Sequence, residues 1–154
     1  MVTLSRIREL MLTFHINTYI YEDMKMASNI LKSISDEQRL RILLLLSNKE
    51  LSVCQLMGVI EKSQPLISRN LSILSGAGFL EERKEGKLKF FKIKEDIAAE
   101  QRAILETLKR IIRNDQQYKE DLKVLKECQK FQKKIGKCDM ETFYKFRELR
   151  KKKE

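Results

Sequence analysis

Apolar side chains recur at steps of three and four residues through most of the chain, the spacing that places them on one face of a helix. Near the N-terminus they form such a stripe over residues 4–31, and its phase shifts at Asn17-Thr18. This shift predicts either two helices or one bent helix. The same periodicity predicts further helices over residues 37–47, from Leu51, from residue 97 onward and over residues 116–135.

The central segment carries the signals of a helix with marked ends. Ser63 suits the N-cap, because its hydroxyl can accept a hydrogen bond from an amide of the first turn, and Pro65 is tolerated in that turn. Apolar residues follow at the spacing of a buried face: Ile67, Leu71 and Leu74. We expect this helix to end at Gly76-Ala77-Gly78, because glycine readily takes the left-handed conformation of a helix C-terminus.

A strand signal follows this helix and predicts a β-hairpin. Residues 79–84 and 87–93 read as strands, and the Glu85-Gly86 pair between them suits a two-residue turn. One proline and five glycines among 154 residues leave little material for an all-β fold. The order of elements therefore predicts a mostly α-helical protein. The expected fold is a winged helix-turn-helix with a two-stranded β-hairpin wing and extra N- and C-terminal helices.

Charge adds a first functional indication. The chain has 32 Lys and Arg against 22 Asp and Glu, and this net charge of +10 suits a nucleic-acid partner. Residues 150–154 are expected to form a frayed, solvated tail. No apolar run is long enough to span a bilayer and the N-terminus does not resemble a secretory signal, so the sequence predicts a cytoplasmic protein without a membrane partner.

The polar face of the helix after Ser63 has the chemistry of a DNA-reading helix. Glutamine and asparagine match the donor and acceptor on adenine, arginine matches guanine, and cations on the hairpin suit phosphates or a minor groove. A short polar helix face can also be merely solvated, but a capped helix beside a basic hairpin favours DNA binding. The predicted DNA contacts are Ser63, Gln64, Ser68, Arg69, Asn70 at the flank of the face, Ser72, Arg83, Lys84 and Lys87.

The ordered motifs of this region resemble those of the ArsR/SmtB family of metal-sensing repressors. They are residues 31–43 (LKSISDEQRLRIL), 49–56 (KELSVCQL), 63–71 (SQPLISRNL) and 76–80 (GAGFL), followed by the basic hairpin. The resemblance covers residues 22–115, which predicts a winged helix-turn-helix domain there. An N-terminal helical extension would occupy residues 1–21, and a basic C-terminal helical extension would occupy residues 116–154.

The resemblance also implies a homodimer that binds an inverted-repeat operator in double-stranded DNA. Wide apolar stripes on the first helix and on residues 97–112 agree with this, because a second copy would bury them. Packing within one chain is the alternative explanation for the same stripes.

Three cysteines bear on what such a regulator would sense: Cys54, Cys128 and Cys138. Taken alone, each is equally well explained as a small buried hydrophobic residue. Arsenic and cadmium sensors of the resembled family carry Glu-Leu-Cys-Val-Cys where this chain has Glu50-Leu51-Ser52-Val53-Cys54. Because one thiolate cannot hold a soft metal ion, we expect the three cysteines together to form the site. As(III) is favoured because it prefers three thiolates.

The sequence thus predicts a repressor that leaves its operator when a thiolate-bound metalloid or soft metal binds, with no required cofactor. Two alternatives stay open: a repressor that responds to thiol redox or persulfide chemistry, and a winged-helix DNA binder without an inducer site. An enzyme is not expected. The chain shows no glycine-rich phosphate loop, no nucleophile with a histidine base and no His/Cys zinc cluster.

Overall fold

The computed structural model describes residues 4–137 and 139–152, and the side chains of residues 14–21 are outside the description. Within this part of the chain, no helix has both the length and the apolar character that crossing a membrane requires. The elements follow in the order α1 (Leu4–Ile34), α2 (Glu37–Leu46), β1 (Leu51–Ser52), α3 (Val53–Ile60), α4 (Gln64–Gly76), β2 (Leu80–Glu85), β3 (Leu88–Ile93), α5 (Ala99–Ile111), α6 (Gln116–Ile135) and α7 (Met140–Lys151).

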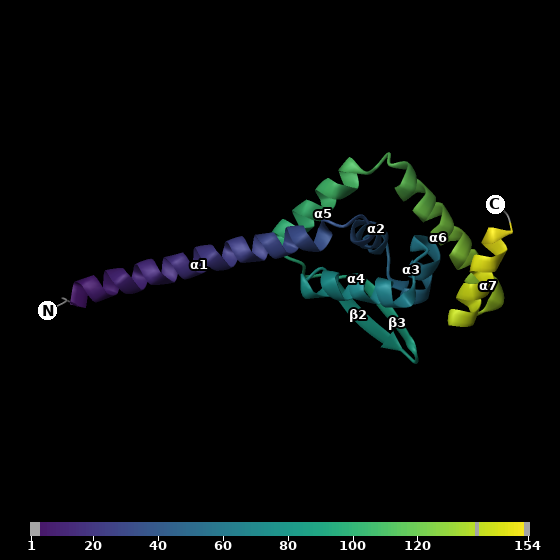
Figure 1. Ribbon diagram of the computed structural model, residues 1–154, viewed down its shortest axis with the longest axis horizontal. Helices are drawn as coiled ribbons and strands as arrows, with labels where there is room; N and C mark the ends of the chain where they lie inside the picture. The colour runs from purple at the N-terminus through teal and green to yellow at the C-terminus, as the bar shows by residue number, and fades with distance from the viewer. Residues whose placement is uncertain (1–3, 138, 153–154) are drawn as a thin grey trace.

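Helix α1 is one continuous element whose N-terminal part projects away from the rest of the molecule (Figure 1). Of the two predicted alternatives at Asn17-Thr18, two separate helices are therefore ruled out, and a single helix is what the structure shows. A change in the phase of an apolar stripe does not interrupt backbone hydrogen bonds, and residues 4–34 contain no proline or glycine that would. The helix also crosses the predicted domain boundary at residue 21 without interruption.

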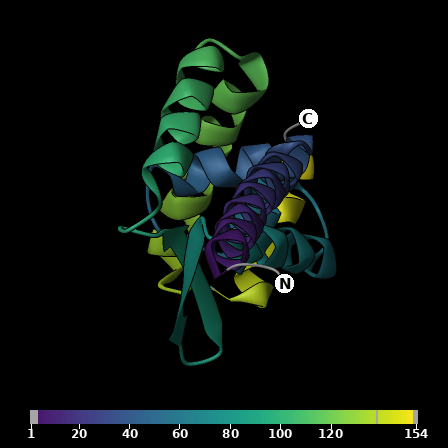
Figure 2. The same ribbon diagram turned by 90° about the vertical axis from the view of Figure 1, so that its left-hand side faces the viewer.

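The core lies where α2, α3 and α4 meet the small sheet. All five residues at positions 42–46 of α2 are buried, because α2 contacts α1, α3, α4 and α6. A helix that is apolar on every side is typical of such an enclosed position. Seen from the side, the turn between α5 and α6 lies at one end of the molecule and the β2–β3 hairpin extends from the other (Figure 2).

The sheet has the strand order β1-β3-β2, with both pairings antiparallel. Glu85 pairs with Leu88, so the turn consists of Gly86 and Lys87, one residue later than predicted. Gly86 has a φ of +59°, a conformation that glycine adopts without steric cost. The pairing of Leu51 with Phe91 joins the hairpin to the residues just before α3.

Strand β1 was not predicted, since Leu51 was expected to open the third helix. Two residues are too few to show a period, and the partner strand lies some forty residues farther along the chain. Helix α3 instead begins at Val53, after Ser52. The Ser52 hydroxyl accepts a hydrogen bond from the Gln55 amide, and the Ser52 amide donates to the Gln55 side chain.

Helices α6 and α7 pack on α3 and belong to the same core as the central segment. Gly58 of α3 allows the close approach, because a Cβ atom there would lie 3.6 Å from Cys128 Sγ and 3.7 Å from the Phe146 ring. The bounds of α6 agree with the prediction, and α6 ends at Gly136, whose φ is +75°. Helix α7 was not predicted.

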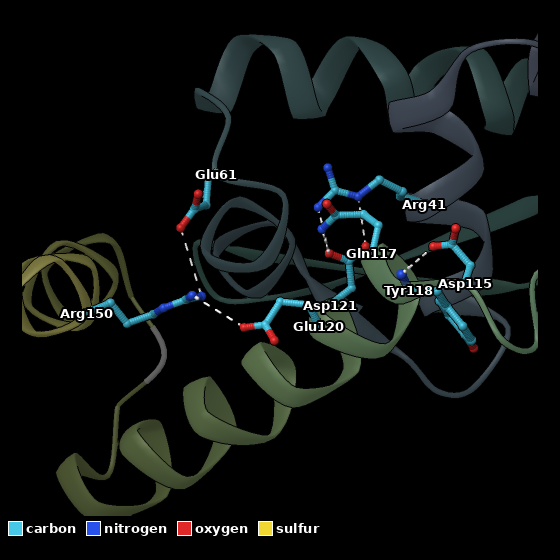
Figure 3. Close-up of polar contacts among 8 residues, drawn as sticks. All are labelled: Arg41, Glu61, Asp115, Gln117, Tyr118, Glu120, Asp121 and Arg150. Atoms are coloured by element: carbon cyan, nitrogen blue, oxygen red, sulfur yellow. Dashed lines mark hydrogen bonds and ion pairs between the residues drawn. The ribbon is translucent and has the colours of Figure 1, made fainter. Parts of the chain in front are cut away.

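The expectation of a solvated tail from residue 150 is wrong for Arg150. This residue lies within α7, and its side chain is 20% exposed. Its guanidinium is 3.9 Å from a carboxylate oxygen of Glu61 and 3.9 Å from one of Glu120 (Figure 3). Arg150 is held at the surface of the fold because Glu61, just after α3, and Glu120 of α6 lie on either side of its guanidinium.

A buried ion pair joins α2 to α6. The Arg41 guanidinium donates two hydrogen bonds to the Asp121 carboxylate, at 2.8 and 2.6 Å, and the Gln117 amide donates a third at 2.9 Å (Figure 3). Asp121 is 1% exposed. The hydrogen bond to Asp121 raises the pKa of Arg41. Such a pair tolerates burial only because its hydrogen bonds are made on both sides.

Asp121→Ala should therefore destabilise the protein. The substitution leaves the Arg41 charge partly buried without its partner, and we expect a loss of about 3 kcal/mol in the free energy of unfolding. Glu120→Ala is the matched control, because Glu120 is exposed and its ion pairs with Lys123 and Arg150 are long. That variant should lose less than about 1 kcal/mol. Urea unfolding measures both, and equal losses would contradict this role for the pair.

Candidate nucleic-acid interface

Helix α4 starts as predicted, but by a different local mechanism. Ser63 is the N-cap and Pro65 lies in the first turn, yet the Ser63 side chain makes no capping hydrogen bond. The Ser63 carbonyl instead accepts from the Ile67 amide at 3.1 Å. The extended backbone of Ser63 and the fixed φ of Pro65 are together sufficient to begin the helix.

The two faces of α4 are sharply different. The buried face carries Ile67, Leu71 and Leu74, each at most 1% exposed, and these contact α2 and α3. The opposite face is exposed and consists of Gln64, Ser68, Arg69 and Ser72. Because its apolar face is held in the core, α4 presents this row of hydrogen-bonding side chains in a fixed orientation.

Asn70 differs from its predicted position at the flank of the polar face. It is 4% exposed, because residues 67, 70, 71 and 74 form one helical stripe and that stripe faces the core. A side chain so enclosed does not reach a base edge. We therefore leave Asn70 out of the candidate contact surface.

The three predicted cations of the hairpin differ in whether they are paired with acidic residues, and Arg83 is the one that is. Arg83 donates to both carboxylate oxygens of Glu50, at 3.0 and 2.7 Å, and to Glu85 at 2.7 Å. Its guanidinium also lies 4.5 Å from the centre of the Phe90 ring. These hydrogen bonds raise the pKa of Arg83 and lower that of Glu50. Arg83 therefore helps to hold the hairpin in place. Its charge is largely taken up by Glu50 and Glu85 and is less available to a partner.

Lys84 and Lys87 retain accessible charge. Lys84 is 69% exposed at its side chain, and its ammonium is 4.0 Å from Glu82, too far for a close ion pair. Lys87 is exposed in the hairpin turn. Lys89, on β3, was not predicted; it is half-exposed on the hairpin but forms an ion pair with Glu82 at 3.2 Å. The alternation of strand side chains would have placed Lys89 on the same face as Lys87.

A cavity of about 230 Å³ lies between the start of α4 and the hairpin. The cavity is lined both by residues predicted to contact DNA and by Cys54, which was predicted to bind a metal. The lining residues include Gln64, Ser68, Lys87, Lys89, Cys54 and Met140. Met140, the first residue of α7, had no predicted role.

The predicted metal ligands are only partly described. Cys54 and Cys128 are 5% and 1% exposed, on α3 and α6, and Cys138 lies outside the described residues. Cys54 Sγ is 3.6 Å from Met140 Sδ, and Cys128 lies beside Gly58 one turn farther along α3. No three His, Cys, Asp or Glu side chains cluster at metal-binding distance within the described ranges. The three-thiolate site stays a prediction.

Exposed apolar side chains concentrate on α1. Leu4, Leu10, Met11, Leu12 and Met24 are each at least 60% exposed, and Ile111 at the end of α5 is 70% exposed. Packing within one chain, the alternative explanation of the apolar stripes, therefore does not cover the N-terminal part of α1. A surface of this kind on a single subunit is typical of a protein–protein interface.

Comparison with known proteins places this geometry in context. The sequence profile described as "Bacterial regulatory protein, arsR family" matches residues 36–82. The "Arsenical resistance operon repressor" of Escherichia coli (strain K12) is 44% identical over 71 residues, which are 46% of this chain and 61% of that protein. The chain thus spans less than two thirds of that relative's length.

Two further proteins match over most of their own length. The "Uncharacterized HTH-type transcriptional regulator MJ1325" of Methanocaldococcus jannaschii is 41% identical over 76 residues, 49% of this chain and 85% of that protein. The solved structure "Reduced HlyU from Vibrio cholerae N16961" is 32% identical, with a TM-score of 0.53 over 60% of this chain and 95% of that chain. The predicted winged helix-turn-helix fold is confirmed.

Proposed function

Because this chain belongs to the ArsR family of winged helix-turn-helix regulators, we propose that it acts as a homodimeric repressor that leaves its operator when a soft metalloid binds. As(III) is the favoured inducer, and the cytoplasm is the proposed compartment. The family match and the relatives named above support DNA binding in the regulation of transcription, rather than catalysis, as part of this proposal.

The observation that carries the proposal is the pairing of the α4 polar face with the lysines of the hairpin. A helix in the major groove reads base edges, and a hairpin beside it reaches the adjoining backbone. Here the exposed face of α4 supplies glutamine, arginine and serine side chains, while Lys84 and Lys87 supply charge next to it. The two surfaces also border one cavity, so they lie close enough to contact one DNA duplex.

The exposed apolar side chains of α1 and α5 support a dimer. A second copy would remove this surface from water, and two-fold symmetry would present two α4 helices to half-sites one helical turn apart. An inverted-repeat operator follows from that symmetry.

The positions of the cysteines support an inducer site that communicates with α4. Cys54 lies in the first turn of α3, at the border of the cavity between α4 and the hairpin. To regulate DNA binding, a ligand at this position has to bind one arrangement of α4 more tightly than another, by about 1–3 kcal/mol. Thiolate–metal bonds are strong enough to supply it, since structural sites reach roughly 10 kcal/mol.

Arg69→Ala should reduce specific binding by roughly 1–3 kcal/mol and relax the preference at one base position of each half-site. Selection of duplexes from a random pool by the full-length protein identifies the operator, which we expect to be an inverted repeat. Titrations of wild type and variant against that operator and a scrambled duplex then measure the effect. Arg147→Ala, an exposed arginine on α7, is the control. Equal loss of affinity for both duplexes would show that Arg69 does not contact a base. Selection of single half-sites, rather than inverted repeats, would argue against the dimer.

Lys87→Ala should weaken binding to every duplex alike, because a phosphate contact carries no sequence information. The slope of log affinity against log salt should fall by about one for each subunit. Lys126→Ala, an exposed lysine on α6, is the matched control and should leave the slope unchanged. A Lys87→Ala slope equal to that of wild type would show that the hairpin turn does not contact the backbone.

Replacing Cys54, Cys128 and Cys138 together by serine should abolish release from the operator by arsenite. In the wild type, release corresponds to a roughly 5–150-fold loss of DNA affinity. Parallel titrations with cadmium, antimonite and polysulfide identify the inducer class. Release of the triple variant by arsenite would contradict a thiolate site, and release of the wild type by polysulfide alone would replace the metalloid with a persulfide signal.

A further inference from the structure

The C-terminal end of α6 carries a group of lysines that has no part in the surface described above. Lys133 and Lys134 lie in the last turn of α6 and Lys137 just after it, and residues 128–138 include no acidic residue. These three, the α6-end lysines, are all exposed. Within the described ranges, none of them forms an ion pair. Their positive charge therefore remains available to an anionic partner.

The acidic residues that follow this group are engaged in contacts of their own. Asp139, the N-cap of α7, accepts hydrogen bonds from the amide and the hydroxyl of Thr142, both at 2.8 Å. Glu141 forms an ion pair with Lys145 at 2.7 Å. The passage from α6 to α7 therefore presents a net positive surface.

The last turns of α6 lie beside the residues that hold the hairpin. The Lys49 ammonium donates a hydrogen bond to the Gln129 side chain of α6 at 2.6 Å. Glu50, the next residue of the chain, holds Arg83 of the hairpin at 2.7 Å. The end of α6 and the hairpin are thus attached to the same short loop between α2 and β1.

The α6-end lysines also lie close to the start of α4. Met140 lines the cavity of about 230 Å³ together with Gln64 of α4 and Lys87 of the hairpin turn. Lys137 precedes Met140 by three residues, and three residues of extended chain span at most about 11 Å. The backbone of Lys137 is therefore within that distance of a residue that borders the proposed DNA-contact surface.

The arrangement of the helices places this end of α6 on the outer side of that surface. Figure 1 shows α1 projecting from one side of α4 and the hairpin, and α6 and α7 lying on the other side. In the proposed dimer, the exposed apolar part of α1 faces the second copy. The α6-end lysines would then lie over the DNA beyond each half-site, away from the two-fold axis.

We propose that Lys133, Lys134 and Lys137 contact the phosphate backbone of the DNA that flanks each operator half-site. This inference rests on the proposed function and extends the contact surface to the C-terminal helices, beyond the residues 36–82 that match the family profile. Lysine suits the role because its flexible point charge approaches a phosphate without a fixed geometry. Such contacts position a protein on the duplex and carry no sequence information.

A purely structural role makes a different prediction. Lysines in the last turn of a helix offset the helix dipole, and this effect falls off within that turn. It would account for Lys133 and Lys134, whereas Lys137 lies beyond the helix. An effect on the dipole changes the stability of α6 and leaves the salt dependence of DNA binding unchanged. The two roles therefore differ in a measurable quantity.

The test compares two triple variants of the full-length protein. The α6-end variant combines Lys133→Gln, Lys134→Gln and Lys137→Gln. The matched control changes three exposed lysines nearer the start of α6, combining Lys119→Gln, Lys123→Gln and Lys126→Gln. Helix α6 starts at the turn after α5, which lies at the opposite end of the molecule from the hairpin (Figure 2). Because each variant loses three positive charges per subunit, a general loss of charge affects both equally.

Affinity for the selected operator is measured against salt concentration on two duplexes. One duplex ends at the half-sites, and the other extends one helical turn beyond each of them. Each phosphate contact contributes about 0.9 to the slope of log affinity against log salt. With one to three contacts per subunit, the α6-end variant should lose about two to five from the slope on the longer duplex. On the shorter duplex it should match the wild type, as the control should on both.

A charge-retaining variant and a stability measurement complete the design. Lys133→Arg, Lys134→Arg and Lys137→Arg together should keep the wild-type slope, and urea unfolding shows that each variant is folded. A wild-type slope for the α6-end variant on the longer duplex would overturn this inference alone, as would an equal loss in the control. Failure of the wild type to bind any selected duplex would overturn the proposed function and this inference together.

Discussion

The burial of α3 on all sides is the constraint on which the rest of the structure depends. Seven of its eight residues are buried, because the helix contacts α4 and the sheet as well as α6 and α7 (Figure 1). A helix this short is unstable by itself, and burial of each large apolar side chain contributes about 1.5–3 kcal/mol. The α4–hairpin part and the C-terminal helices therefore share one core, so a shift of either on α3 would disturb the packing of the other.

Ion pairs divide the charged residues into those that hold the structure and those that remain available. Arg41 is committed to Asp121 inside the protein, and Arg83 to Glu50 and Glu85 on the hairpin. On the hairpin, Lys89 also pairs with Glu82, and Lys92 pairs with Glu81 and Glu95, whereas Lys84 and Lys87 keep their charge exposed to solvent. A net charge of +10 thus overstates the charge that faces a partner, and the positive field of the hairpin comes mainly from Lys84 and Lys87.

The sulfur-containing residues lie where this shared core meets the polar face of α4. Cys54 and Met140 join the first turns of α3 and α7, and Cys128 packs against Gly58 on the same short helix. A ligand on these residues would act on the packing that orients α4. Coupling of this kind requires only that the ligand bind one arrangement of the core better than another.

Local signals in the sequence were sufficient for much of the fold. The end of α6 at Gly136, the apolar face of α4 and the existence of the hairpin depend on neighbouring residues, so periodicity and turn chemistry could predict them. The polar residues of α4 were likewise identifiable, because helical spacing alone separates their face from the buried one. Asn70 was misplaced although its spacing from Ile67, Leu71 and Leu74 puts it on the buried stripe, because its polar side chain suggested the opposite face.

The remaining features needed partners that are distant in the sequence. Strand β1 exists because β3 lies beside it, Arg83 is occupied because Glu50 faces it, and Arg150 is enclosed because Glu61 and Glu120 flank it. The contact between Cys54 and Met140 joins residues more than eighty positions apart. The sequence by itself determined most of the helices, though not α7, together with the hairpin and the chemistry of the polar face. Tertiary structure alone decided which charges and sulfur atoms meet, because such pairs form only when packing brings their elements together.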